Sequence, residues 1–281
     1  MDRERQNKIL PYLMLMPAMA VMAIVVIYPI FSCIVTSFTQ EEAGGFGFEN
    51  YLYFLADPLQ LTNIGYTLAI VLVTVVLAVG IAYLLAIYLR FSNSLVSRWI
   101  GKLYLLPRFI PGLVAVNGMI TIISNSGLLN RLSRLFGADW QLGLMYDAKG
   151  IVLMNLWFNI PFATMLMGAA MSAINNSEIE AARDVGAGKL RIFWKIILPL
   201  TYRDIFVSAT FVFMGNISSF TTPYLMGGNH PTMMGVTMYN LYGNQHFGRS
   251  AALSVIMFIL SALSAVMYIY VNMRKDQWEK N

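Results

Sequence analysis

Six long runs of apolar residues, separated by short polar stretches, make up most of this 281-residue sequence. An α-helix needs about twenty apolar residues to cross a hydrocarbon layer roughly 30 Å thick. Hydrophobic residues account for 58% of the chain and charged residues for 12%, more apolar surface than a soluble core of this size could bury. We therefore expect an all-α integral membrane protein with six transmembrane helices, at about 10–38, 63–90, 99–123, 149–172, 203–222 and 250–273.

The distribution of Lys and Arg predicts the orientation of these helices, because cytoplasmic loops of membrane proteins are enriched in basic residues. With the N-terminus in the cytoplasm, fourteen basic residues fall in cytoplasmic segments and four fall outside. We therefore expect a multi-pass protein of a bacterial-type cell membrane (inner or plasma membrane) with both termini in the cytoplasm. The loop between the fourth and fifth helices is then cytoplasmic as well.

Neither a metal centre nor a catalytic site is expected. Cys33 is the only cysteine and lies in an apolar run, while His230 and His246 lie sixteen residues apart. These positions fit neither a disulfide framework nor a metal-binding pair on one helix. The net charge of +5 comes from basic residues that flank apolar runs, as on membrane spans. Membrane lipid, and not nucleic acid, is the expected partner of these charges.

Two of the predicted outer segments have patterns of their own. Residues 126–137 place four leucines at helical spacing opposite two arginines, which predicts a short amphipathic helix along the membrane surface. The segment 222–249 is rich in Gly, Asn and Tyr, and we expect it to close the outer end of whatever the helices enclose.

The loop at 173–202 is the most charged stretch of the chain. Its sequence predicts a short helix at about 178–185 that ends before Gly186. A second short helix is predicted at about 189–197 and is ended by Pro199. Small side chains on the first helix let its backbone approach another surface closely, so the loop is suited to insertion into a partner.

An ordered pattern runs through this loop: Glu180-Ala181-Ala182, Gly186 after a three-residue gap, and Ile196-Ile197-Leu198-Pro199. It resembles the EAA loop of permease subunits in binding-protein-dependent ABC importers, a family that also has six spans with this loop between the fourth and fifth. The resemblance implies a type I ABC importer permease fold, a single permease domain over 1–281 and cytoplasmic coupling helices. In the family this loop seats in a groove of the ATP-binding subunit. The residues implied in coupling are Glu180, Ala181, Ala182, Asp184, Gly186 and Pro199.

The chain is not expected to hydrolyse ATP itself. Gly188-Lys189 could be taken for part of a phosphate-binding loop, but that motif needs Gly five residues before its second Gly and Ser or Thr after Lys. This sequence has Arg183 and Leu190 at those positions. The resemblance therefore implies that no cofactor is held by this chain and that ATP and Mg are bound by a separate ATPase subunit.

Polar residues within the apolar runs are candidates for a solute pathway, because polar groups inside a membrane span are costly and usually face a cavity or a partner helix. Hydrogen bonding between packed helices is the alternative role for the same residues. Arg108, between Pro107 and Pro111 in the third run, is interpreted as a structural or interfacial charge. The candidate pathway residues are Asn117, Asn155, Asn159, Asn216, Ser219, Phe220 and Tyr224.

Different segments of the sequence resemble two subfamilies of these permeases, which imply different solutes. Residues 182–187 and 222–228 resemble permeases of the spermidine/putrescine type, whereas 48–51 and 251–254 resemble sugar permeases related to maltose uptake. Asp184-Val185-Gly186 departs from the Asp-Gly-Ala of the sugar group, so we favour the polyamine type. A maltose- or glycerol-phosphate-like sugar permease is the alternative, because no acidic residue that would attract a polyamine lies inside a span.

Functions of other classes are weighed against transport. A membrane sensor or scaffold usually carries a soluble output domain, and a secondary transporter often carries an intramembrane Asp or Glu; the sequence shows neither. The resemblance implies that six spans form half of a pathway. The implied partners are a second, non-identical permease subunit, two copies of an ATP-binding cassette subunit and an extracytoplasmic solute-binding protein.

Overall fold

The computed structural model describes residues 13–40 and 45–273. Within these ranges the chain is almost entirely helical, and its only β-type pairing is one isolated bridge between Thr39 and Phe46. Six helices of the described residues are long and apolar enough to cross a membrane, which confirms the predicted fold class. Their bounds are Leu13–Ser37, Pro58–Phe91, Gly112–Leu135, Ala148–Ser172, Lys189–Ile217 and Phe247–Tyr270.

The described chain forms two compact units. The first unit comprises the chain up to Leu61 together with Met238–Phe258, and the second comprises Thr62–Thr237 and the chain from Ile259 onward. The expectation of a single permease domain over 1–281 stays a prediction.

The first unit is organised around the C-terminal end of its first long helix. A π-helical turn at Ala23–Ile27 leads into α2 (Tyr28–Ser37), and α3 (Glu49–Ala56) follows after the bridge. The buried Asn50 side chain of α3 donates hydrogen bonds to the carbonyl of Ser37, the last residue of α2, at 3.0 Å and to that of Thr39, two residues later, at 2.9 Å. One amide therefore ties α3 to the last turn of α2.

α14 (Phe247–Met273) begins in the same unit, directly against this junction. A Cβ added to Gly248 would lie 2.6 Å from Nδ2 of Asn50 and 2.8 Å from the carbonyl of Thr39. Only glycine fits that position without displacing the hydrogen-bonded amide. The guanidinium of the neighbouring Arg249 lies 4.5 Å from the ring centre of Tyr53 in α3, a further contact between the start of α14 and α3.

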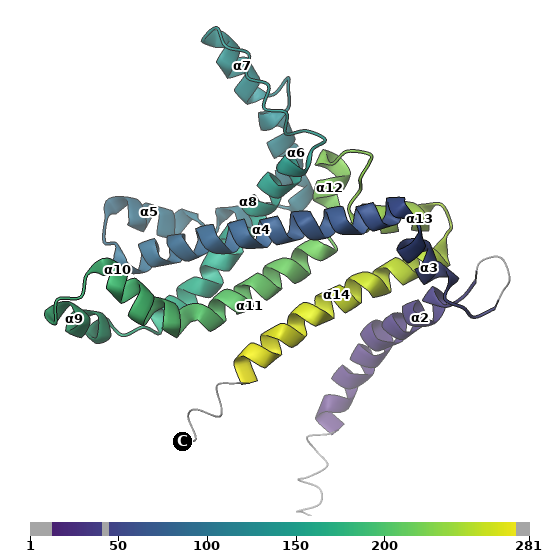
Figure 1. Cartoon of the computed structure of the whole chain (residues 1–281), viewed down its shortest axis with the longest axis horizontal. Helices are drawn as coiled ribbons and strands as arrows, with labels where there is room; N and C mark the ends of the chain where they lie inside the picture. Colours follow the sequence, from purple (N-terminus) through teal and green to yellow (C-terminus); the bar gives the residue numbers. More distant parts are fainter. Residues whose placement is uncertain (1–12, 41–44, 274–281) are drawn as a thin grey trace, which may run out of the picture. The chain divides into compact units, whose positions relative to one another are not determined.

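The second unit contains the helices that position the candidate site (Figure 1). Most of α4 (Pro58–Phe91) packs here with α8 (Ala148–Ser172) and α11 (Leu198–Ile217). On α4 the buried residues Ala78, Ala82 and Ala86 recur every four positions, and such small side chains let membrane helices approach closely. The core that they share with α8 and α11 includes Met167, Met171 and Val212.

The third predicted span is interrupted. Its residues form α5 (Leu95–Leu103), a 3₁₀ turn at Leu106–Phe109 and α6 (Gly112–Ile123). The interruption coincides with Pro107 and Pro111, because proline lacks the N–H that a continuous helix requires. The candidate span accordingly covers Gly112–Leu135, which includes α6 and the later helix at Leu128–Leu135, and not 99–123 as expected.

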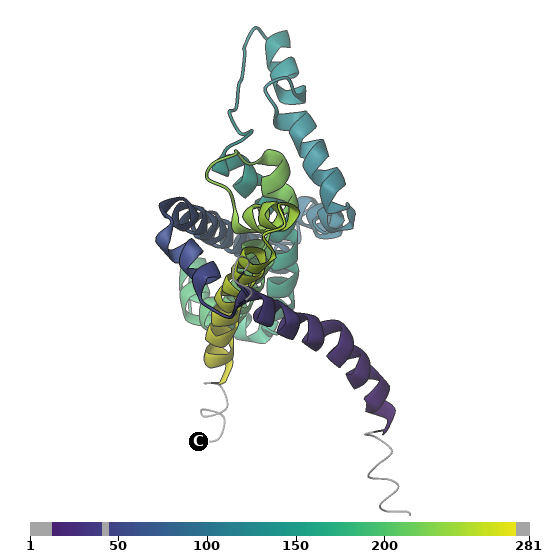
Figure 2. The ribbon, with the colours of Figure 1, turned by 90° about the vertical axis from the view of Figure 1, so that its right-hand side faces the viewer.

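The predicted amphipathic helix is α7 (Leu128–Leu135). Its four leucines are exposed, while Asn130 and Ser133 are buried on the opposite side. α6 packs against residues of α8 and of the segment at Thr221–Met226, and α7 extends beyond it, away from α4, α8 and α11, in both views (Figures 1 and 2). Placement along the membrane surface stays a prediction.

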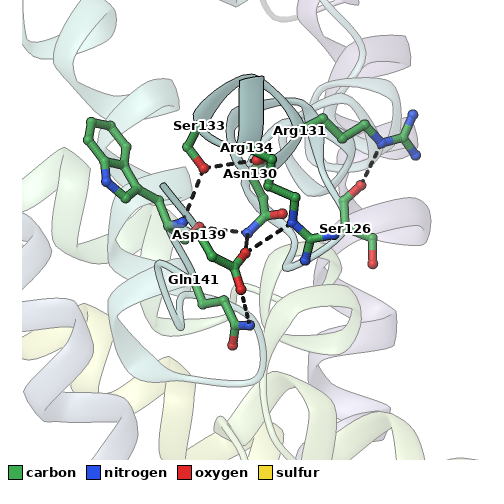
Figure 3. Close-up of polar contacts among 8 residues, drawn as sticks. Ser126, Asn130, Arg131, Ser133, Arg134, Asp139 and Gln141 are labelled. Carbon is green, nitrogen blue, oxygen red and sulfur yellow. Dashed lines mark hydrogen bonds and ion pairs between the residues drawn. The ribbon is translucent and has the colours of Figure 1, made fainter. Parts of the chain in front are cut away.

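The buried side of α7 holds the returning chain through a polar network (Figure 3). Asn130 donates to a carboxylate oxygen of Asp139 at 2.8 Å and to the carbonyl of Trp140 at 3.1 Å. Arg134 pairs with the same carboxylate at 3.1 Å. These hydrogen bonds, that of Asn130 first, lower the pKa of Asp139 and favour its ionised form. The sequence indicated the leucine face of α7 and the arginines opposite it, but not the buried Asn130 and Ser133 or their contacts with the returning chain.

The fifth span differs from expectation at both ends. Pro199 does not end a helix: α10 (Lys189–Ile192) continues through a π-helical turn at Phe193–Ile197 into α11. Within that turn the N–H of Leu198 bonds to the carbonyl of Phe193, five residues earlier. A widened turn of this kind accommodates a proline ring that would clash with a regular helix.

At its other end, α11 stops at Ile217, five residues before the predicted end of this span. The following segment, expected to be an outer loop, contains α12 (Thr221–Met226) and α13 (Met234–Gly243). The sequence misses these helices because they are short and lie among Gly, Asn and Pro residues that usually mark loops.

The junction in the first unit gives a stability prediction. Asn50→Ala leaves the carbonyls of Ser37 and Thr39 without their amide donor, a loss of about 1–3 kcal/mol for buried groups. We expect a lower midpoint of thermal unfolding for the detergent-purified protein. The matched control is Glu49→Ala, an exposed neighbour on the same helix, which should leave the midpoint almost unchanged. Equal midpoints for Asn50→Ala and the unchanged protein would contradict this role of Asn50.

Candidate functional site

The loop that carries the Glu180-Ala181-Ala182 pattern begins with a well-formed helix. α9 spans Asn176–Asp184, close to the predicted 178–185. Gly186 has a φ of +81°, the left-handed region that glycine adopts most readily. The N–H of Ala187 bonds to the carbonyl of Ala182 at 2.9 Å, and that of Gly186 to the carbonyl of Arg183 at 2.8 Å. This pair of bonds is a Schellman termination, so the predicted turn at Gly186 is present.

The side chains implied in coupling are accessible. Glu180, Ala181, Asp184 and Gly186 are exposed, and Ala182 is partly buried. Pro199 is exposed at the start of α11, thirteen residues after Gly186 in the sequence. It lies within the continuous helix Lys189–Ile217 and not in the turn.

Three large apolar side chains of the same loop also lie open. Val185 is 83% exposed, Leu190 72% and Trp194 58%. Ile179 and Ile192, by contrast, are buried in the core formed with α4. The loop is therefore fixed by one set of apolar residues and presents another, and a partner that covered the second set would remove that apolar area from water.

Arg90, near the end of α4, holds the base of this loop. It donates hydrogen bonds to the carbonyls of Met171 (3.2 Å) and Ile174 (3.0 Å) at the end of α8, and to Oδ1 of Asn176 (2.7 Å) at the start of α9. The last carbonyls of a helix have no partner within the helix. Arg90 supplies hydrogen-bond donors at this end of α8 and thereby joins α4, α8 and α9.

A cavity of about 620 Å³ lies within the second unit. It brings together five of the seven predicted pathway residues: Asn155, Asn159, Asn216, Ser219 and Phe220. Asn159 lies eleven residues after the start of α8 and thirteen before its end, so the cavity is near the middle of this span. Besides these five residues it is lined by Arg108, Gly112, Phe158, Phe162, Phe211, Met214, Gly215, Thr221 and Thr222.

The amides in the cavity bond to one another and to helix backbone. Nδ2 of Asn159 donates to the carbonyl of Asn155 at 2.7 Å and to Oδ1 of Asn216 at 3.3 Å. Nδ2 of Asn216 donates to the carbonyl of Val212 at 2.6 Å. Asn155 is only 2% exposed, and its Nδ2 has no hydrogen-bond partner among the described residues. Helix–helix bonding and a lining role are thus both present in this cluster.

The wall of the cavity includes a break in the fifth span. α11 ends at Ile217 and α12 begins at Thr221, which leaves Ser218, Ser219 and Phe220 outside regular helix. Non-helical backbone at membrane depth is tolerated where it is buried in protein or lines a water-filled cavity. Broken helices of this kind also form solute sites in other transporters.

Two predicted pathway residues do not line this cavity. Asn117 is exposed on α6 and donates to the carbonyl of Leu113 in its own helix. Tyr224 is exposed, and its ring stacks on Phe220 with centres 4.9 Å apart. The cavity is also lined by residues outside the predicted set, among them Arg108, which was interpreted from the sequence as a structural or interfacial charge. A charged residue between two prolines in an apolar run was the available signal.

A comparison with protein families identifies the chain. Residues 78–277 match the family described as "Binding-protein-dependent transport system inner membrane component". The chain belongs to this family. The resemblance of the loop at 173–202 to the EAA loop is thereby supported by a match over most of the sequence.

Individual relatives cover nearly the whole chain. The sulfoquinovosyl glycerol transport system permease protein SmoG of Agrobacterium fabrum is 29% identical over 96% of this chain and 92% of its own length. The spermidine/putrescine transport system permease protein PotB of Escherichia coli is 26% identical over 83% of this chain and 87% of its own length. Both solute types considered from the sequence are therefore represented among its relatives.

Solved structures show the same fold. A chain of a bacterial ABC transporter for import of the acidic polysaccharide alginate aligns with a TM-score of 0.80 at 19% identity, over 98% of both chains. A chain of the methionine ABC transporter MetNI aligns with a TM-score of 0.58, over 76% of this chain and 94% of that chain. The fold is that of an ABC importer permease, and the protein is a multi-pass membrane component of such a system.

The turn at Gly186 gives a test with a matched control inside the same loop. Gly186→Ala forces an L-residue into the left-handed region, at a cost of roughly 1–2 kcal/mol. Gly188→Ala makes the same change at an extended residue with φ −70° and open space around it. We expect the first variant alone to increase amide hydrogen exchange in α9 and α10. Equal exchange in the two variants would show that the turn does not depend on the left-handed residue.

Proposed function

We propose that this chain forms half of the translocation pathway of an ATP-driven importer and that a polar solute passes by the cavity between α8 and the break after α11. The observation that carries the proposal is a mid-span cavity lined by side-chain amides and hydroxyls at a broken helix. Such groups can exchange hydrogen bonds with a polar solute that leaves water, which plain hydrocarbon walls cannot do.

The proposed energy source is a separate ATPase subunit that binds ATP and Mg and receives the exposed loop. We assign the polar contact to Glu180, the close fit to Ala181 and Ala182, and the turn to Gly186. Asp184 adds a second exposed carboxylate on α9. The open apolar side chains of Val185, Leu190 and Trp194 are consistent with a surface covered on assembly.

The assembly that we propose contains two ATPase copies, a second and non-identical permease subunit, and an extracytoplasmic solute-binding protein. The family description supports a binding protein in general terms. So does the alginate transporter of the same fold, whose structure includes an alginate pentasaccharide-bound periplasmic protein. The proposed orientation places both termini and the α9–α10 loop in the cytoplasm, as the excess of basic residues predicts.

The solute is a polyamine or a sugar on the sequence resemblances, and relatives of both kinds match this chain. Residues 48–51, which carry part of the sugar resemblance, include the Asn50 junction of the first unit. A residue with a packing role does not discriminate between solutes. The choice between a polyamine and a sugar therefore depends on the residues that line the cavity.

The proposed coupling is tested in the complete transporter, co-expressed with its ATPase, partner permease and binding protein. Glu180→Ala should reduce transport and solute-stimulated ATP hydrolysis by at least about tenfold and weaken retention of the ATPase during purification. Glu178→Ala is the matched control, an exposed carboxylate of the same helix that is not part of the pattern. ATP hydrolysis by the purified chain alone, or transport without the ATPase, would overturn the proposal.

A further inference from the structure

Arg108 is the one charged residue among those that line the cavity. It lies in the 3₁₀ turn at Leu106–Phe109, between Pro107 and Pro111. Its guanidinium carbon is 5.0 Å from the centre of the Phe162 ring on α8. Phe162 lies fourteen residues after the start of α8 and ten before its end. The positive charge is therefore held near the middle of a membrane span.

A cation at this depth needs an environment other than lipid. Charged side chains within membrane spans are costly and almost always face a protein interior or a water-filled cavity. Arg134 pairs with Asp139, whereas Arg108 forms no ion pair with a carboxylate of the described residues. The guanidinium of Arg108 therefore lacks a counter-charge from the described part of its own chain.

The guanidinium N–H groups of Arg108 form no hydrogen bond with a described residue, and its contact with the Phe162 ring leaves them available. A guanidinium that lies over an aromatic ring uses its face, whereas its N–H donors point outward in the plane of the group. Those donors fit a carboxylate, phosphate or similar oxyanion through two parallel hydrogen bonds. The unpartnered Nδ2 of the buried Asn155, another residue of the cavity wall, is a further donor with no acceptor in the described chain.

We infer that Arg108 binds an anionic oxygen group of the transported solute, so that the pathway takes an anionic, hydroxylated solute and disfavours polyamines. This inference rests on the proposed function and specifies its substrate class. The amides and hydroxyls of the cavity would bind the hydroxyl groups of such a solute. A polyamine would bring several positive charges toward this unpaired cation, and the like charges would repel one another.

The first test uses the complete transporter in proteoliposomes with its binding protein and a defined panel of solutes. The anionic members are glucuronate and glucose 6-phosphate, the neutral member is glucose, and the cationic members are putrescine and spermidine. We expect ATP-dependent uptake of an anionic member and not of the polyamines. Uptake of glucose or of a polyamine in preference to both anions would overturn the anion assignment while leaving the proposed function intact. ATP-dependent uptake of no member would count against the proposed function.

The second test asks whether the guanidinium itself acts on the anion. Arg108→Gln should lower uptake of the anionic solute at least about tenfold, and Arg108→Lys should retain part of it because the charge is kept. The control is Arg98→Gln, which removes an exposed charge from α5 outside the cavity, and it should transport normally. Basal ATP hydrolysis and recovery of the assembled complex are measured in parallel.

The two readouts separate anion binding from a structural role. If Arg108 binds the anion, Arg108→Gln assembles and hydrolyses ATP at the basal rate, but higher anion concentration partly restores its uptake. If Arg108 instead pairs with a carboxylate of the partner permease, Arg108→Gln loses assembly or basal hydrolysis, and added anion restores nothing. The second result would overturn the inference.

Discussion

Within a hydrocarbon layer, the backbone groups released at a helix break must find partners, because no water is available to them. The break between α11 and α12 meets this requirement locally: the N–H of Ser219 bonds to the carbonyl of Asn216 at 3.1 Å, and that of Tyr224 to the carbonyl of Phe220 at 2.9 Å. Gly235 lets the chain pass directly over the carbonyls of Ser218 and Ser219. These hydrogen bonds reduce the energetic cost of ending α11 at Ile217, and the break that follows forms part of the cavity wall.

The same helix connects the cavity to the exposed loop. α10, the π-helical turn and α11 form one helix of 29 residues, Lys189–Ile217. Its first residues follow the turn at Gly186, and Asn216, near its end, hydrogen-bonds to Asn159 in the cavity wall. The buried contact between Tyr83 and Thr201, 2.8 Å apart, holds the middle of this helix to α4. In our account, movement imposed on the loop by an ATPase reaches the cavity through a single rigid element.

Sequence reasoning predicted those features that depend on local physics. The six apolar helices follow from length and hydropathy, and the turn at Gly186 follows from the one residue type that readily adopts a positive φ. Five of the seven predicted pathway residues line the cavity, and four of them are Asn or Ser, which in an apolar run usually face a cavity or a partner helix. Asn117 also donates to a carbonyl of its own helix, as Asn159 and Asn216 do, but it is exposed on α6 and does not line the cavity.

Other features depend on packing between segments that are distant in sequence. The π-helical turn before Pro199 is stable because Ile197 is buried and Phe193 packs against the same core, so tertiary contacts override the helix-ending tendency of proline. The polar side of α7 is defined by Asp139 and Trp140 from the returning chain. Arg108 could be assigned to the cavity only when the 3₁₀ turn was seen against Phe162 on α8.

The most direct test of the account asks whether the break lines a path that solute occupies. Cys33 is the only cysteine, so Ser219→Cys in a Cys33→Ser background places one thiol at the break. In the assembled transporter we predict that a small membrane-impermeant maleimide labels this thiol and that transported solute with ATP changes the labelling rate severalfold. A thiol that is unreactive with and without solute and ATP, in a variant that still transports, would contradict the account.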